Sequence, residues 1–181
     1  KVGTGLINDH WSFDARLSNI GTDGYIDRAS VDLYSFYAQG GYFADNTSVK
    51  FITFGGKEKT YHAWNYATKE EMKKYGRRFN SCGMYTDDDG HIRFYKDQTD
   101  NYLQINNQLV LSHRFNEKWT LNATGFYTYG YGFYKQYKDA RTLSEYLNIP
   151  ADVAAGKEAD LVREKIMRNH LGGLNASAAY S

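Results

Sequence analysis

Hydrophobic and polar residues alternate over the stretch from Asn101 to Gly130, NYLQINNQLVLSHRFNEKWTLNATGFYTYG. In its second half, one alternating set is apolar or aromatic: Trp119, Leu121, Ala123, Gly125, Tyr127 and Tyr129. The intervening set is mostly polar: Thr120, Asn122, Thr124 and Thr128, with Phe126 among them. Side chains along a strand point to opposite faces in turn, so the pattern predicts strands with one apolar and one polar face. The break at Asn116-Glu117 predicts a tight turn, and therefore a long antiparallel hairpin.

The spacing of the aromatic residues along this hairpin matches the height of a membrane barrel's apolar band. Tyr127 and Tyr129 follow Trp119 by eight and ten positions on the same face. At about 3.3 Å per residue and a tilt of about 40°, they stand roughly 20 and 25 Å above Trp119. An outer-membrane barrel carries an apolar band about 25 Å tall, edged by aromatic girdles. A half-buried strand of a soluble β-sandwich also alternates, so this hairpin alone leaves both architectures open.

The same alternation recurs on both sides of the hairpin. Strands are predicted over Val2 to Leu6, Trp11 to Asn19, Leu33 to Phe43, Ser48 to Phe54 and Leu171 to Tyr180. The pairs Asn8-Asp9 and Asp45-Asn46 predict short turns between them. Because Val2 and Tyr180 both lie in strands at the ends of the chain, we expect a piece of a longer protein.

Three long connections are predicted at about 20–31, 57–99 and 131–169, where the alternation is lost. Within the second, a short helix is predicted over Thr68 to Tyr75, and a small hairpin with a type I′ turn at Asp89-Gly90. The third is predicted to be partly helical, because Thr142-Leu-Ser-Glu145 has the form of a capping box. Residues 159–168 also place apolar positions at roughly helical spacing.

The connections alternate between short and long along the chain. In an up-and-down meander, this places every short turn on one rim and every long loop on the other. Bacterial outer-membrane barrels show this asymmetry. The apolar sets of the predicted strands contain no Asp, Glu, Lys or Arg, whereas the long loops are rich in them. We therefore predict an all-β antiparallel meander rather than a soluble sandwich. Seven strands cannot close such a barrel, so residues 1–181 are expected to form an arc of a larger one.

Composition agrees with this picture and narrows the function classes. The chain has 181 residues with 17% aromatic residues, 17 Gly and one Pro, which favours strands. Its net charge of +1 gives no bulk attraction to nucleic acid, and no nucleic-acid partner is predicted. Cys82 is the single cysteine, so the chain cannot form an internal disulfide.

Particular stretches resemble a known family. They are GTGLINDHWSFDARLSNIGTDGYIDRASVDLYSFYAQGGYF, FGGKEKTYHAWNY and the strand start Thr99-Asp100-Asn101-Tyr102. These resemble the barrel of TonB-dependent outer-membrane receptors of the Bacteroidetes type. The resemblance implies a 22-stranded barrel, filled by a plug, that imports a ferric chelate, haem, cobalamin or a glycan. It also implies outer-membrane lipid, TonB and a surface lipoprotein as partners. The chain holds neither a plug nor a TonB box, so energy coupling cannot be assigned to it.

Candidate site residues are few. Tyr61, His62, Trp64 and Tyr66 lie in the loop 57–99 and are predicted to contact a ligand by ring stacking; packing within the loop is the alternative. The histidines have no metal-ligand spacing, and Asp87-Asp88-Asp89-Gly90 lacks the order of a calcium loop, so we predict no metal site. No catalytic set or cofactor site is predicted either. The two functions left open are nutrient import and a β-domain, secreted or in the outer membrane, whose loops bind a partner protein or glycan.

The alternation also predicts an orientation for individual side chains. We expect these residues to point toward lipid: Trp11, Phe13, Leu17, Tyr34, Phe36, Leu109, Leu121 and Tyr127. Their polar neighbours should point into the barrel lumen: Asp14, Arg16, Gln39, Gln108 and Asn122.

Overall fold

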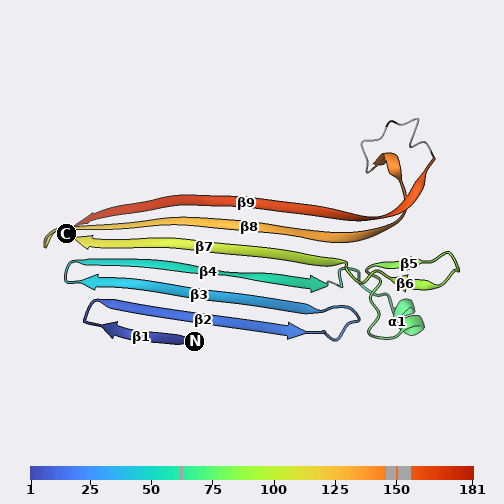
Figure 1. Cartoon of the computed structure of the whole chain (residues 1–181), viewed down its shortest axis with the longest axis horizontal. Helices are drawn as coiled ribbons and strands as arrows, with labels where there is room; N and C mark the ends of the chain where they lie inside the picture. The colour runs from blue at the N-terminus through green and yellow to red at the C-terminus, as the bar shows by residue number, and fades with distance from the viewer. Residues whose placement is uncertain (62, 146–149, 151–155) are drawn as a thin grey trace.

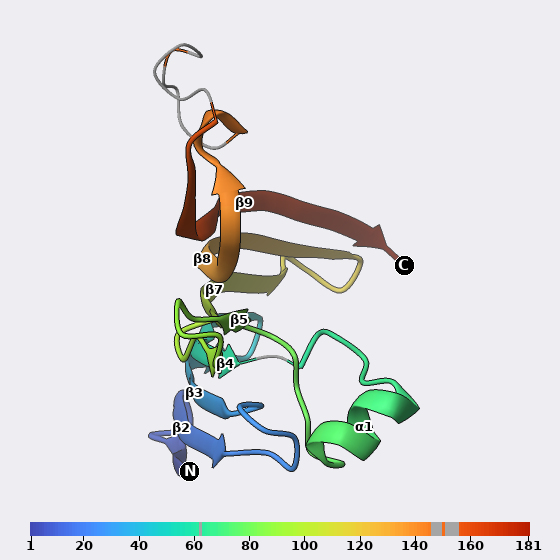
Figure 2. The ribbon, with the colours of Figure 1, turned by 90° about the vertical axis from the view of Figure 1, so that its right-hand side faces the viewer.

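Seven strands form one antiparallel sheet in the computed structural model, which describes residues 1–61, 63–145, 150 and 156–181 (Figure 1). The sheet strands are β1 (Val2–Ile7), β2 (Trp11–Thr22), β3 (Val31–Ala44), β4 (Thr47–Tyr61), β7 (Thr99–Arg114), β8 (Trp119–Thr142) and β9 (Glu158–Tyr180). Each pairs with its sheet neighbours in chain order, so the predicted all-β meander is confirmed. Seen from the long-loop end, the strands lie in a single layer (Figure 2).

The connections divide between the two ends of the sheet as expected. Turns at 8–10, 45–46 and 115–118 lie at one end, and the long connections 23–30, 62–98 and 143–157 start from the other (Figure 1). Asn8 and Asp9 both have positive φ, at 47° and 58°. Asn and Asp tolerate that conformation better than other non-glycine residues, which explains their place in this turn.

All three long connections are shorter than predicted, because the strands continue into them. The largest correction concerns 131–169: β8 runs on to Thr142 and β9 begins at Glu158. The helix predicted over 159–168 is therefore wrong. This stretch pairs with β8, for example Ile166 with Phe133, and the ladder supplies the backbone hydrogen bonds that a helix would have supplied. Thr142 ends a strand rather than beginning a helix, and the 3₁₀ turn η1 (Leu143–Glu145) follows it.

The connection between β4 and β7 carries its own secondary structure. It holds α1 (Lys69–Tyr75) and a two-stranded sheet of β5 (Met84–Thr86) and β6 (Ile92–Phe94). The predicted helix is confirmed, and Thr68 caps it: its hydroxyl accepts from Glu71 N at 3.1 Å, and the Glu71 carboxylate accepts from Thr68 N at 2.8 Å.

The small hairpin is also confirmed, but its predicted type I′ turn is wrong. Only Gly90 has positive φ there, and Gly90 N donates to Asp87 O at 2.9 Å. A turn of this kind, with one glycine in the left-handed region, belongs to a longer hairpin loop.

The sheet has no interior of its own. Among the described residues, the buried side chains lie mainly at the long-loop end: Thr60, Tyr61, Phe79, Asn80, Cys82 and Thr99. The core formed by the described residues is therefore a small one, beneath the connection between β4 and β7.

Candidate functional site: two sheet faces and a loop cluster

The cross-strand register sorts the sheet into an apolar face and a polar face. Paired residues in an antiparallel ladder lie on the same face. Leu17 pairs with Phe36, and Leu109 pairs with both Phe51 and Gly125, so the apolar sets of successive strands merge. All eight side chains expected to face lipid share this apolar face, and the five expected to face the lumen share the polar face.

The apolar face is exposed. Its most exposed large side chains include Leu17 at 81% and Tyr127 at 45%, while Phe36, Leu111 and Leu121 are half-buried between their neighbours. Four successive cross-strand rows, from the row of Trp11 to that of Leu17, contain no Asp, Glu, Lys or Arg on this face from β2 to β9. Monomeric soluble proteins rarely expose contiguous apolar patches of more than a few hundred Å².

Aromatic residues edge the apolar face at the short-turn end. The Trp11 ring lies 4.9 Å from Tyr42, and the Trp119 ring lies 5.1 Å from Tyr180. Both tryptophans begin their strands directly after a short turn. Rings with one polar atom favour the boundary between an apolar medium and water.

The opposite edge of the apolar face combines tyrosines with cations. Tyr34 pairs with Lys57, and Tyr131 pairs with Arg168, whose guanidinium carbon lies 5.5 Å from the Tyr131 ring. Charged side chains therefore reappear on this face at the same level as the tyrosines.

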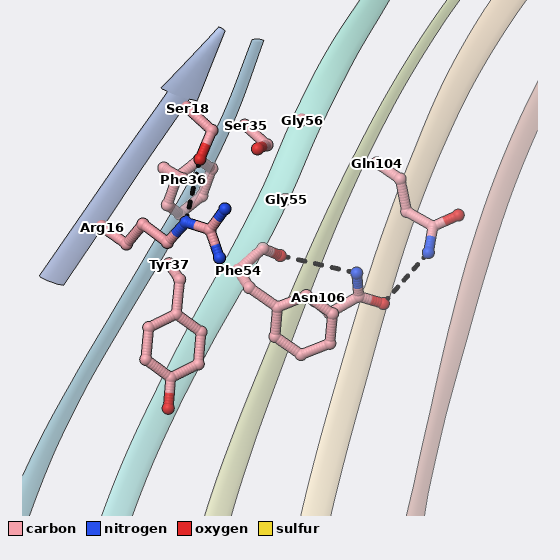
Figure 3. Close-up of a pocket in the computed structure, with 10 residues that line it drawn as sticks. All are labelled: Arg16, Ser18, Ser35, Phe36, Tyr37, Phe54, Gly55, Gly56, Gln104 and Asn106. Atoms are coloured by element: carbon pink, nitrogen blue, oxygen red, sulfur yellow. Dashed lines mark hydrogen bonds between the residues drawn. The ribbon is translucent and has the colours of Figure 1, made fainter. Parts of the chain in front are cut away.

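The polar face carries hydrogen-bonded side-chain ladders. On β7, Tyr102 donates to Gln104 at 3.1 Å, and Gln104 donates to Asn106 at 3.2 Å; Thr128 of β8 also donates to Asn106, at 2.9 Å. Figure 3 shows part of this face around a hollow of about 610 Å³, in which Arg16 turns toward Ser18. These groups hydrogen-bond one another yet stay open to water.

A small core joins two of the long connections into what we call the loop cluster, residues 23–30 and 63–98. Tyr61 is 4% exposed, and its hydroxyl lies 2.7 Å from Tyr95 O and 3.1 Å from Cys82 O. Burial raises the pKa of the Tyr61 phenol, so the hydroxyl stays protonated and can donate to these carbonyls. A side chain at Gly83 would not fit, because a Cβ there would lie 2.6 Å from the Tyr61 hydroxyl.

Arg28 and Asp27 fasten the first connection to the second. The Arg28 guanidinium donates to Asn80 O and lies 3.8 Å from the centroid of the Phe94 ring. Asp27 O accepts from the Asn80 amide at 3.0 Å, and its carboxylate pairs with Arg78 at 3.1 Å. The cluster therefore combines stacking, ion pairing and hydrogen bonds between segments about 50 residues apart.

The loop cluster also packs against β8 through aromatic contacts and an ion pair. The Tyr137 ring lies 4.6 Å from Tyr85 and 5.6 Å from Tyr95. Lys135 donates to the Asp97 carboxylate at 2.7 Å, which lowers the pKa of Asp97 and raises the pKa of Lys135. The extended part of β8 thus serves as the platform for the loop cluster.

The four predicted ligand contacts differ in their surroundings. Tyr61 is the last residue of β4 and forms part of the small core, while His62 lies outside the described residues. Trp64 is 49% exposed and its ring lies 5.8 Å from Tyr134; Tyr66 is 98% exposed. Two of the four therefore present rings to solvent, and ligand contact by them stays a prediction.

Trp64 lines a polar cleft of about 260 Å³. Its other lining residues include Asn65, Gln98, Gln136, Tyr137 and Lys138. The sequence does not predict the contributions of β8, because its pattern favours a loop over 131–169. The alternation of Tyr131, Phe133 and Lys135 with small or polar residues was the signal that could have revealed them.

The acidic turn of the small hairpin brings Asp87, Asp89 and His91 within metal-ligand distance of one another. Asp87 already accepts from Arg93 at 2.8 Å and from His91 N at 2.7 Å, and the Arg93 hydrogen bond is the main cause of the lowered pKa of Asp87. A cation would have to compete with the Arg93 guanidinium, so the geometry favours a turn.

Among the helical residues that the structure describes, none forms a helix long and apolar enough to cross a membrane. No protein-family model, curated protein or solved structure matches the chain.

Proposed function

We propose that this chain is part of the wall of a transmembrane β-barrel of the TonB-dependent receptor type, which imports a scarce nutrient across the outer membrane. The observation that carries the proposal is the exposed apolar face, uncharged over four cross-strand rows and edged by aromatic rings. A lipid environment accounts for that face without any second protein layer.

The dimensions support a membrane span. On β8, Trp119 and Tyr127 are separated by eight residues, and Tyr129 by ten. With about 3.3 Å per residue and a tilt of about 40°, the interval is roughly 20–25 Å, close to the height of a barrel's apolar band. The strands extend past this band only toward the long-loop end, as they do in barrels with long outer loops.

The sheet edges support continuation into a closed barrel. Among the described residues, β9, a strand of 23 residues, pairs with β8 alone, and β1 pairs with β2 alone. Unpaired strand edges are unfavourable in lipid, because their backbone groups have no water to bond. Further strands would close the sheet, and a 22-stranded barrel with a plug is the architecture that the family resemblance implies.

The polar face then lines the lumen, and the loop cluster lies at the outer rim. The imported ligand would be a ferric chelate, haem, cobalamin or a glycan, and it would meet the exposed rings of Trp64 and Tyr66 first. TonB would act through the plug, and a surface lipoprotein could cover the long loops.

Growth on a limiting nutrient tests this function directly. Cells that lack the full-length gene should lose energy-dependent uptake of one nutrient, and its restoration should require TonB. The protein should fractionate with the outer membrane and shift its gel mobility on heating. Uptake that is unchanged for every nutrient class above would contradict the proposal.

The loop cluster favours a second candidate function. Its core would give a stable binding surface even without transport, so the domain could instead capture a partner protein or glycan. In that case a Trp64→Ala variant would lose surface capture of the ligand, while accumulation inside the cell would be absent in wild type and variant alike.

A further inference from the structure

Along β9, cationic and acidic side chains lie on opposite faces near the end of β7 and beyond it. Gln136 pairs with Arg163, and Tyr134 pairs with Lys165, so both β9 cations lie on the polar face. Lys138, two positions beyond Gln136 on β8, shares that face. Asp160 and Glu164 alternate with these cations along β9 and therefore lie on the opposite face.

Asp160 and Glu164 already have hydrogen-bond or ion-pair partners on their own face. The Asp160 carboxylate accepts from the Tyr137 hydroxyl and, at 2.9 Å, from Ala140 N. Glu164 lies 3.8 Å from Lys135, which also holds Asp97. They are not positioned to neutralise the cations of the polar face.

Within the described ranges, these cations have hydrogen-bond and ring contacts rather than carboxylate partners. Among the described residues, no ion pair joins Lys138, Arg163 or Lys165 to an acid. Arg163 donates from its Nη2 to the Gln136 amide oxygen, while its buried Nε has no hydrogen-bond partner in the described part of the chain. Burial, together with Arg163, Arg141 and Lys165, lowers the pKa of Lys138. One described acid of β7 to β9 also lies on the polar face. It is Asp100, which pairs with Tyr134 in the row of Lys165.

An exposed aromatic surface adjoins these cations. Trp64 lies 5.8 Å from Tyr134, and Lys165 Nζ lies 5.6 Å from the same tyrosine ring on its β9 side. Trp64 and Lys138 line one cleft, together with the amides of Gln98 and Gln136. A ligand seated there would meet a ring, amide groups and positive charge together.

We propose that Lys138, Arg163 and Lys165, with Trp64 beside them, bind a soluble ligand that bears carboxylate or phosphate groups. Arginine and lysine form their strongest hydrogen bonds with such oxygens, and unneutralised cations above a low-dielectric wall concentrate anions. The inference deepens the proposed function and rests on it only for placing the polar face toward the lumen. Lipid headgroups carry phosphates too, but they would lie against the apolar face.

Calorimetry on the full-length protein in neutral detergent tests the assignment. The probes are citrate and inorganic pyrophosphate, with glucose as the uncharged comparison, and vesicles of phosphatidylcholine with or without phosphatidylglycerol as the lipid comparison. Arg163→Gln should weaken citrate or pyrophosphate binding about tenfold, since it removes a charged hydrogen-bond donor from the ligand. The matched control is Arg168→Gln, the same charge change on the apolar face of the same strand.

Saturable binding of either soluble anion that falls in Arg163→Gln, and not in Arg168→Gln, supports the site. An absence of saturable anion binding, equal losses in both variants, or binding only to vesicles that contain phosphatidylglycerol would overturn it. Heat-modifiable gel mobility shows that each variant is folded. It also separates the two proposals, since a folded outer-membrane protein that binds no anion refutes this site and leaves the barrel intact.

Discussion

The sheet and the loop cluster differ in how far their apolar side chains are buried within the chain. In the sheet, backbone ladders satisfy the polar backbone, but the apolar side chains, such as Leu17 at 81% exposure, have no protein layer above them. In the loop cluster, Cys82 is almost fully buried against Tyr61, the last residue of β4, and distant segments supply the contacts. Under the proposed function, the sheet depends on an apolar medium outside the chain, whereas the loop cluster is stabilised by contacts within the chain.

The largest expected effect comes from placing a charged side chain on the apolar face of the sheet. Ala123 lies on the apolar face midway between Trp119 and Tyr127, and Thr124 lies on the polar face beside it. Ala123→Arg should destabilise the full-length barrel by about 2–4 kcal/mol, the cost of arginine near the lipid midplane. Urea unfolding in phosphatidylcholine vesicles measures this, with Thr124→Arg as the matched control. Equal losses in the two variants would mean that both faces meet the same medium.

A smaller effect is expected when the core of the loop cluster is disturbed. Gly83 has φ +71° and no room for a Cβ, whereas Gly90 has φ +80° and open space around it. An alanine at either site strains the backbone by about 1–3 kcal/mol, and only Gly83→Ala adds a collision with Tyr61. Hydrogen exchange of residues 63–98 should therefore rise throughout the cluster in Gly83→Ala and only near the turn in Gly90→Ala. Matching exchange patterns would show that the Tyr61 contact does not hold the cluster together.

The next prediction concerns one hydroxyl group. Tyr61→Phe leaves the buried carbonyls of Cys82 and Tyr95 without their phenol donor, which should cost the cluster about 1–3 kcal/mol. Tyr66→Phe, at a 98% exposed ring, should cost nothing measurable. Protease sensitivity of residues 63–98 compares the two variants. If Tyr61→Phe resists cleavage as well as the parent protein does, the Tyr61 hydroxyl does not stabilise the loop cluster.

The smallest effect depends on pH. Lys135 holds the pKa of Asp97 below its ordinary value, so this pair stabilises the folded cluster above the unfolded pKa of about 3.9. The contribution is lost as the pH falls through the lower folded pKa. Because Asp97 is 43% exposed, solvent screens the pair, and the effect should stay below about 1 kcal/mol.

Asp97→Asn should therefore speed hydrogen exchange of the loop cluster slightly at pH 7. The difference from wild type should vanish once the pH is below the folded pKa of Asp97. A difference that persists unchanged at low pH would assign the effect to packing rather than to the ion pair.

The sheet could be predicted from sequence where side chains alternate between two media. Trp11 to Leu17 and Trp119 to Tyr129 specify their faces by period two alone, and the register follows from short turns. The same reasoning failed over 159–168, because both faces there are polar or mixed and the helical spacing of a few apolar residues competed with the strand pattern.

The loop cluster could be predicted only in part. The capped helix after Thr68 follows from a local signal. The burial of Tyr61 and the link from Arg28 to Asn80 do not, since they join residues that no local pattern connects. For the same reason, the sequence grouped Tyr61 with Trp64 although their surroundings differ.

The orientation of the apolar face toward lipid is tested most directly by spin labels on β8. Single cysteines are introduced as Leu121→Cys, Asn122→Cys, Ala123→Cys and Thr124→Cys in full-length protein that carries Cys82→Ala, reconstituted in vesicles. Labels at 121 and 123 should be relaxed mainly by oxygen, which concentrates in lipid, and labels at 122 and 124 mainly by a water-soluble nickel chelate. A lack of period-two alternation, or alternation with the opposite phase, would contradict the account.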